Sequence, residues 1–313
     1  MNRRLHIALL ASALLAPAAG AAEGPVNVSF LYSLSSTTGF IPFSGASIAL
    51  DFQNRELLVR ADGVFRVFNE SGMEVFSFGD SPEVGGLIAV ASLEDGSILG
   101  FALGEQKTAL LRLNFRGELI ERFEVTGIPA EHRDFHPSAM RYWNGRIYLA
   151  DLGGMRILVA DAHGKFEKFF DIAAMMDVPD KRQDLGLKTF NVDKRGNILF
   201  TIQPLFHGYV LSLDGNLREF GTRGSGPGKF NVVAGIAADE HGNYYVSDIL
   251  KSSIIVFDKD FRFIKEFGGR GRQPGSLAAP IEIEAGNGKI YVSQYARRGV
   301  SVFKIESEPA PAS

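Results

Sequence analysis

Short apolar runs separated by polar turn residues repeat along most of this chain. In the clearest unit, residues 234–267, four such runs follow one another, and Asp239, Gly242 and Asn243 lie between the first two. Asp and Asn hydrogen-bond their own backbone, and Gly adopts positive φ, so all three favour tight turns. The unit therefore predicts four short strands joined by tight connections.

The same pattern occurs six times. The second run of each unit begins at Leu57, Ile98, Ile147, Ile198, Tyr244 and Ile290. Intervals of about 40–50 residues are typical of propeller blades rather than of solenoid repeats. The third runs are apolar on consecutive residues, as at 254–257, which is expected of strands that are buried on both faces. The sequence predicts an all-β, six-bladed β-propeller of four-stranded antiparallel blades.

The two ends of the chain predict how the ring closes. The sixth unit, residues 281–305, lacks a fourth run, whereas residues 28–34 form a spare apolar run ahead of the first unit. Pairing the spare strand with the sixth unit completes six blades and leaves no open sheet edge at the junction. We therefore expect the N-terminal strand to close the last blade.

Two junctions between units share the element FG-x-R-G-x-x-PG, at residues 220–228 and, in a looser form, at 267–275. With the adjoining stretch AGIAADEHGNYYVSD, this element resembles NHL repeats. The resemblance extends over nearly all of residues 23–305 and implies the propeller fold. It does not imply one function, because similar propellers include lyases, lactonases, RNA-binding proteins and protein-binding scaffolds.

The first 22 residues predict a cleaved signal peptide. Arg3 and Arg4 precede an apolar run and a small-residue stretch that ends at Ala22, which is the pattern of a secretory signal. The chain has no cysteine, so it has no disulfide, thiolate metal site or lipidated cysteine. We expect a periplasmic or secreted protein in which residues 23–305 form the propeller and residues 306–313 a disordered tail.

Charge and hydropathy narrow the possible partners. The formal net charge is −3, and Lys and Arg are spread along the chain without a basic stripe, which argues against nucleic-acid binding. No later apolar run reaches the roughly 20 residues of a membrane-spanning helix. The expected partner is a protein or a small molecule, and no membrane span is predicted.

Two kinds of enzymatic propeller can be compared residue by residue. Resemblance to amidating lyases implies zinc-binding histidines where the innermost strands begin, but the matching positions hold Ala46, Gly85, Pro137, Lys188, Ala234 and Ile281. A lactonase-like channel implies carboxylate and Asn ligands for a metal, and here Glu282 alone is expected to point inward. Asp51, Asp193 and Asp239 are interpreted as turn formers. No catalytic residue, metal or cofactor is predicted.

Two connections are unusually long, residues 126–136 and 171–188. Both lead into innermost strands, so both are expected on one face of the propeller, beside the channel. Long loops in compact domains are usually functional or disordered, although an insertion without a partner is an equal alternative. The predicted binding residues on these loops are Arg133, His136, Lys181, Arg182 and Lys188.

Two functions therefore stay open. The favoured one is a non-catalytic binding or assembly module that acts through its loop-rich face in a periplasmic envelope or redox-associated system. The alternative is a hydrolase or lyase, lactonase-like or amidating-lyase-like, that acts on a small substrate at the channel mouth. A stoichiometric divalent metal in the purified protein would favour the alternative.

Overall fold

The description of the fold rests on a computed structural model, which describes residues 26–36, 39–40, 45–79, 81–103, 108–295 and 299–307. The predicted signal peptide, residues 1–22, lies outside these residues, as does the chain after 307.

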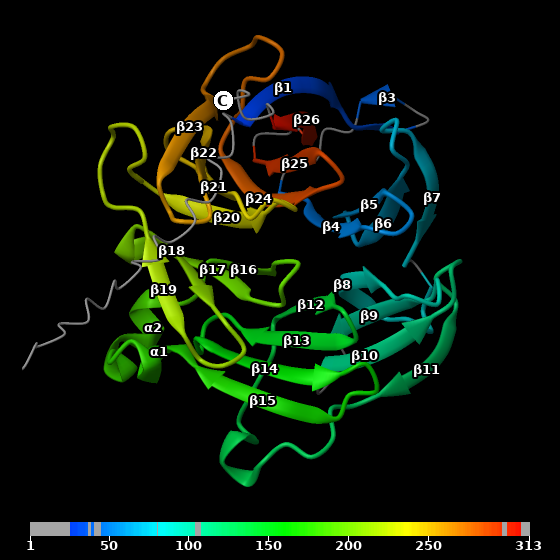
Figure 1. Cartoon of the computed structure of the whole chain (residues 1–313). Helices are drawn as coiled ribbons and strands as arrows, with labels where there is room; N and C mark the ends of the chain where they lie inside the picture. Colours follow the sequence, from blue (N-terminus) through cyan, green and yellow to red (C-terminus); the bar gives the residue numbers. More distant parts are fainter. Residues whose placement is uncertain are drawn as a thin grey trace, which may run out of the picture.

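Six four-stranded antiparallel sheets are arranged as blades around a central channel (Figure 1). This confirms the six-bladed β-propeller that the repeat predicted. Each blade begins with the strand nearest the channel, and each second strand begins within one residue of its predicted position.

Each of the first three blades consists of four strands that are consecutive in the sequence. Blade 1 has strands β4 (Ser47–Asp51), β5 (Glu56–Ala61), β6 (Val64–Phe68) and β7 (Glu74–Phe78). Blade 2 has strands β8 (Gly86–Ser92), β9 (Ile98–Leu103), β10 (Thr108–Leu113) and β11 (Leu119–Phe123). Blade 3 has strands β12 (Ala139–Trp143), β13 (Arg146–Asp151), β14 (Arg156–Asp161) and β15 (Phe166–Asp171).

The second half of the ring has the same organisation, except that its last blade takes one strand from the N-terminus. Blade 4 has strands β16 (Thr189–Val192), β17 (Ile198–Ile202), β18 (His207–Leu211) and β19 (Leu217–Phe220). Blade 5 has strands β20 (Val233–Ala238), β21 (Tyr244–Asp248), β22 (Ser253–Phe257) and β23 (Phe263–Gly268). Blade 6 has strands β24 (Pro280–Gly286), β25 (Lys289–Gln294), β26 (Val300–Ser307) and β1 (Val26–Ser33).

The N-terminal strand closes the ring, as predicted. β1 pairs antiparallel with β26, and the paired residues run from Val26 with Ser307 to Ser33 with Ser301. β26 continues to Ser307, so the first two residues of the predicted tail belong to this strand. Closure gives β26 a partner on its outer side and leaves its backbone hydrogen-bonding groups unexposed.

The blades pack through the faces of their strands. All five residues of β22 are buried, and one apolar cluster joins Leu199 and Val210 of blade 4 to Val246 and Ile255 of blade 5. A strand between two neighbouring blades buries both of its faces, which explains the consecutive apolar residues of the third runs.

Hydroxyl groups on second strands add hydrogen bonds between blades. Each hydroxyl donates to a backbone carbonyl oxygen at the start of the next blade. Thr201 donates to Ala234, Ser247 to Ile281, and Ser293 to Ala46. Each of these side chains is fully or almost fully buried. Equivalent positions in blades 2 and 3 hold Phe101 and Ala150, so these bonds tie together only part of the ring.

Short helices interrupt the long connections. The connection before blade 3 contains η1 (Ala130–His132), and the connection before blade 4 contains α1 (Ile172–Met175), η2 (Pro179–Lys181) and α2 (Arg182–Leu185). α1 contains the apolar residues Ile172 and Ala173, both of which are buried. The remaining elements are η3 (Gln203–Leu205) and the small pair β2 (Ser35–Ser36) and β3 (Gly39–Phe40). No helix in the described part of the chain is long and apolar enough to cross a membrane.

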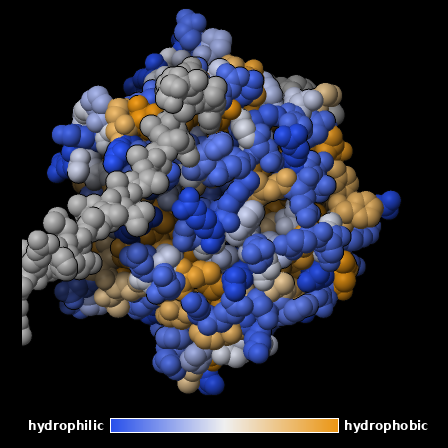
Figure 2. All heavy atoms as spheres, in the orientation of Figure 1, coloured by the Kyte–Doolittle hydropathy of each residue, from blue (hydrophilic) through white to orange (hydrophobic). Residues whose placement is uncertain are grey.

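The face in Figure 2 is mostly hydrophilic, with separate apolar patches. Orange spheres gather near its right-hand edge, where β7 and β11 lie in Figure 1. The large exposed apolar side chains of this part of the ring are Met73, Val75, Phe76, Phe115 and Ile120.

Candidate functional site

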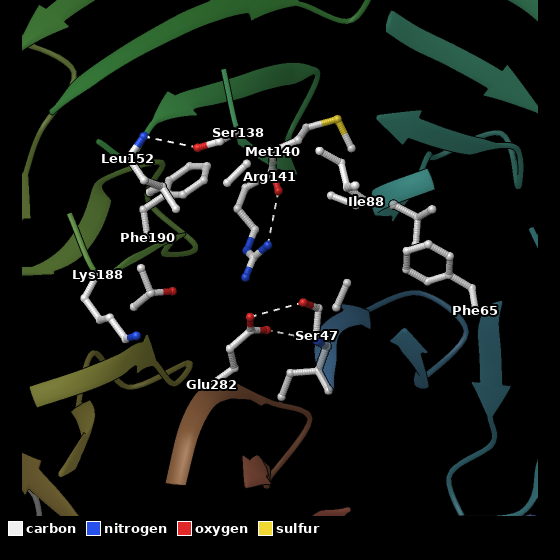
Figure 3. Close-up of a pocket in the computed structure, with 16 residues that line it drawn as sticks. Ser47, Phe65, Ile88, Ser138, Met140, Arg141, Leu152, Lys188, Phe190 and Glu282 are labelled. Carbon is white, nitrogen blue, oxygen red and sulfur yellow. Dashed lines mark hydrogen bonds between the residues drawn. The ribbon is translucent and has the colours of Figure 1, made fainter. Parts of the chain in front are cut away.

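A cavity of about 220 Å³ lies at one end of the central channel (Figure 3). This is the end at which the innermost strands begin, called the upper end below. Five of the six blades contribute to its wall: Ser47, Ile48, Ala49, Phe65, Ile88, Ala89, Val90, Ser138, Ala139, Met140, Arg141, Leu152, Lys188, Thr189, Phe190 and Glu282. The cavity therefore combines an apolar wall with a few charged side chains.

Glu282 points into the cavity, as the sequence predicted. The pairing of β24 with β25 shifts register between Pro280 and Ile283, and an irregularity of this kind redirects the side chains within it. The carboxylate of Glu282 accepts hydrogen bonds from the Ser47 hydroxyl at 3.3 Å and the Ile48 backbone N–H at 3.0 Å. These bonds hold it in place across the junction between blades 6 and 1.

Arg141, on β12, directs its guanidinium toward the same space (Figure 3). Its Nη1 donates to the Met140 carbonyl oxygen at 3.1 Å, and its Nη2 lies 3.7 Å from Oε1 of Glu284. The guanidinium also lies 5.7 Å from the centre of the Phe190 ring. Its Nε is buried and has no hydrogen-bond partner among the described residues, and a buried donor left unpaired is costly.

Glu284, on β24, is buried next to Arg141. The amide of Asn191 donates to Oε2 of Glu284 at 3.3 Å and to the Ile283 carbonyl oxygen at 3.4 Å. Burial raises the pKa of Glu284 to about 7, although Arg141 and Asn191 oppose the shift. Near neutral pH this carboxyl group is therefore divided between its ionised and neutral forms.

Lys188 is exposed at the mouth of the cavity, just before β16. Its backbone N–H donates to the Thr201 carbonyl oxygen at 2.8 Å, and its ammonium group points into the cavity (Figure 3). Among the described residues the ammonium has no hydrogen bond or ion pair. Lys188 therefore lies at the channel mouth.

Aromatic and charged side chains meet across the opposite, lower end of the channel. The rings of Phe52 from blade 1 and Trp143 from blade 3 are 5.3 Å apart, and the Trp143 indole donates to the Lys194 carbonyl oxygen at 3.2 Å. The Lys194 ammonium donates to Glu240 at 3.1 Å, and the Asn287 amide donates to the Phe52 carbonyl oxygen at 3.5 Å. This network links blades 1, 3, 4, 5 and 6 at the lower end, where Phe52 and Trp143 also line a second cavity of about 200 Å³.

The two long loops are tied together at one end of blade 3. Asp134 of the first loop accepts a hydrogen bond from Arg156 at 2.8 Å, and Arg156 pairs along the sheet with Asp171. Asp171 accepts from the guanidinium of Arg182 with both oxygens, at 2.7 and 2.8 Å. The loops therefore lie in one sector, as the topology predicted.

The predicted binding residues do not form one site. Arg133 and His136 line a separate cavity of about 290 Å³ between blades 2 and 3, and Lys181 is exposed on its loop. The guanidinium of Arg182 binds Asp171 and the Gly154 carbonyl oxygen within its own sector of the fold. Of the five predicted residues, only Lys188 lines the central cavity.

The interpretation of the aspartates as turn formers is confirmed. Asp51, Asp193 and Asp239 each accept two backbone N–H bonds from the turn that follows them. Among the described residues, no group of three or more His, Cys, Asp or Glu side chains could hold a metal ion.

The sequence reasoning missed Arg141, Asn191 and Glu284. One signal could have found them: each is a polar residue within an innermost strand whose neighbours are largely apolar. Strands with two covered faces place such residues in the core or at the channel, and burying a charge requires a partner.

Solved structures share the fold of this chain. A Bacteroides thetaiotaomicron VPI-5482 protein of unknown function matches with a TM-score of 0.63 and 15% identity, over 91% of this chain and 77% of that one. Virginiamycin B lyase from Staphylococcus aureus matches with a TM-score of 0.54 and 15% identity, over 92% and 90%. A luciferin-regenerating enzyme matches with a TM-score of 0.58 and 11% identity, over 90% and 95%.

The chain is a six-bladed β-propeller. Identities this low show the fold alone, because one fold serves many functions. No family model matches the chain, and no curated protein matches its sequence.

Proposed function

We propose that this chain is an exported, non-catalytic binding propeller of the NHL-repeat kind that holds an anionic group of its ligand at the upper channel mouth. One observation carries the proposal: the guanidinium of Arg141 and the unpaired ammonium of Lys188 both point into the same cavity (Figure 3). The carboxylate or phosphate group of a ligand carries the charge and the acceptor oxygens that these two cationic side chains favour.

The surroundings of Arg141 support this role. Its bond to the Met140 carbonyl oxygen, its contact with Glu284 and the neighbouring Phe190 ring fix the guanidinium before a ligand arrives. A guanidinium held in this way loses little conformational freedom on binding. The partly apolar wall of the cavity strengthens charge-assisted hydrogen bonds because it excludes water.

The alternative function is a lyase or hydrolase at the same cavity. The similar structures include virginiamycin B lyase, of which a histidine-to-alanine variant is described as catalytically inactive. The described residues that line the cavity here include no histidine. The two functions differ in one outcome, because an enzyme converts its ligand and a binding module releases it unchanged.

The proposed function is tested with the purified protein and a panel of small carboxylates and phosphates, by isothermal titration calorimetry. We expect at least one anion to bind, Lys188→Gln to weaken it at least about tenfold, and the control Lys181→Gln to leave it unchanged. Mass spectrometry of the incubated ligand should recover it intact. Conversion of the ligand would favour the enzyme, and absence of anion binding would overturn the proposal.

Export is tested separately. When the full chain is produced in a bacterium with a periplasm, the intact mass of the periplasmic protein should lack residues 1–22. A chain that retains Arg3 would contradict the export proposal and leave the cavity proposal standing.

A further inference from the structure

The charged groups of the upper cavity stand on opposite sides of it (Figure 3). Arg141 and Lys188 come from blades 3 and 4, whereas Glu282 comes from blade 6 and faces them. An ion of one sign would be attracted to one side of the cavity and repelled by the other. The cavity therefore favours a ligand that carries both charges.

The carboxylate of Glu282 is held in place and can accept hydrogen bonds from a cationic group. Its two hydrogen bonds, from the Ser47 hydroxyl and the Ile48 backbone N–H, fix the carboxylate on the cavity wall. An ionised carboxylate has about four acceptor sites, so these two bonds leave room for an ammonium group.

The third part of the wall is apolar. Phe65, Ile88 and Met140, from blades 1, 2 and 3, line the cavity away from Lys188 and Glu282 (Figure 3). Phe65 and Met140 are almost fully buried. An aliphatic or aromatic group placed against them would be removed from water, which favours binding.

We propose that the upper cavity binds a free α-amino acid with an apolar side chain, its carboxylate between Arg141 and Lys188, its ammonium group on Glu282 and its side chain against Phe65 and Ile88. The proposal rests on the proposed function, since it names the ligand of that same site. It also agrees with the size of the cavity, about 220 Å³, which suits a single small molecule.

Three ligands of nearly the same shape test the proposal on the unaltered protein. L-leucine carries both charges, 4-methylpentanoate lacks the ammonium group, and 3-methylbutylamine lacks the carboxylate. By calorimetry at pH 7.5 we expect L-leucine to bind at least about tenfold more tightly than either analogue, because each analogue loses one charge-assisted contact.

Two variants assign the contacts. Glu282→Gln should weaken L-leucine about tenfold but should not weaken 4-methylpentanoate, because the variant also removes a negative charge that repels an anion. Lys188→Gln should weaken both ligands. Glu131→Gln, an exposed carboxylate on η1, is the matched control and should change neither. Circular dichroism and thermal unfolding check that each variant is folded, and the ligand series on the unaltered protein stands whether or not a variant folds.

The outcomes separate the two proposals. If 4-methylpentanoate binds as tightly as L-leucine, the amino-acid proposal is overturned and the anion-binding function stands. If neither L-leucine nor its acid analogue binds while another anion does, the amino-acid proposal alone fails. If neither L-leucine nor any other carboxylate or phosphate binds, both proposals fail.

Discussion

Arg141 and Glu284 show how single buried charges are held inside this channel. Arginine stays charged at any ordinary pH, so its partial burial requires acceptors, which the Met140 carbonyl oxygen and Glu284 provide. Glu284 can instead take up a proton, because burial raises its pKa to about 7. The pair therefore keeps one permanent charge and one that depends on pH.

The pKa of Glu284 predicts a pH-dependent stability. Its folded-state value, about 7, lies above the ordinary value of 4.5, so the neutral form stabilises the fold. That stabilisation is complete below about pH 4.5 and is lost as the pH rises through about 7. Relative to Glu284→Gln, the unaltered protein should lose about 3 kcal/mol of unfolding free energy between pH 4.5 and 8.

Urea unfolding of both proteins at several pH values measures this difference. The Gln variant is its own control for every other titrating group, because those groups are common to both proteins. Unfolding free energies that run parallel across the whole pH range would show that Glu284 does not titrate abnormally.

At the scale of elements, the connection before blade 4 is anchored rather than free. Asp171 is the N-cap of α1 and accepts a hydrogen bond from the Ala174 backbone N–H at 3.0 Å. Burial alone would raise the pKa of Asp171, but hydrogen bonds from Arg182 and Ala174 outweigh it and lower the pKa. The ionised carboxylate thus holds both ends of the short helical segment.

Asp171→Asn should loosen this connection. The variant keeps a capping oxygen but loses the charge that binds Arg182, so we expect a loss of about 1 kcal/mol in stability and faster amide hydrogen exchange over residues 172–187. Asp180→Asn, an exposed carboxylate in the same connection, is the control. Hydrogen exchange that is equally slow in all three proteins would contradict the anchoring role.

The strands could be predicted from the sequence because each depends on local patterns: turn residues at fixed places and apolar runs between them. Glu282 and Lys188 could be placed because topology brings the beginnings of innermost strands to the channel. The apolar neighbours of Arg141 in its strand could have indicated a position in the core or at the channel, but only packing between blades decides where its side chain points. The role of Arg182 was missed because its partner, Asp171, is identified only when the loop folds back on blade 3.

At the scale of the whole molecule, the ring is held by contacts between residues far apart in sequence. β1 with β26 joins the two ends of the described chain, and the Ser293 hydroxyl of blade 6 binds the Ala46 carbonyl oxygen just before blade 1. The side chain of Phe30 packs against Phe303 at 5.7 Å between ring centres. Blade 6 is therefore the junction on which closure depends.

A chain without residues 26–33 should fail to close. Removing β1 uncovers the hydrogen-bonding edge of β26 and exposes apolar side chains beneath it, so we expect aggregation or a loss of at least about 3 kcal/mol in stability. Size-exclusion chromatography and thermal unfolding measure both effects. A chain without residues 308–313 is the control, and a β1 deletion as monomeric and stable as this control would refute closure by β1.

The pairing of β1 with β26 also determines how long β1 waits for its partner strand during synthesis of the chain. β1 leaves the ribosome before any other strand, but its partner is the last to be made. At 5–20 residues per second, the intervening chain takes roughly 15–60 seconds to synthesise. Throughout that interval β1 has no place in a finished sheet and is open to pairing with strands of neighbouring nascent chains. Protection by a chaperone would therefore matter most at the beginning of this chain, long before its last blade exists.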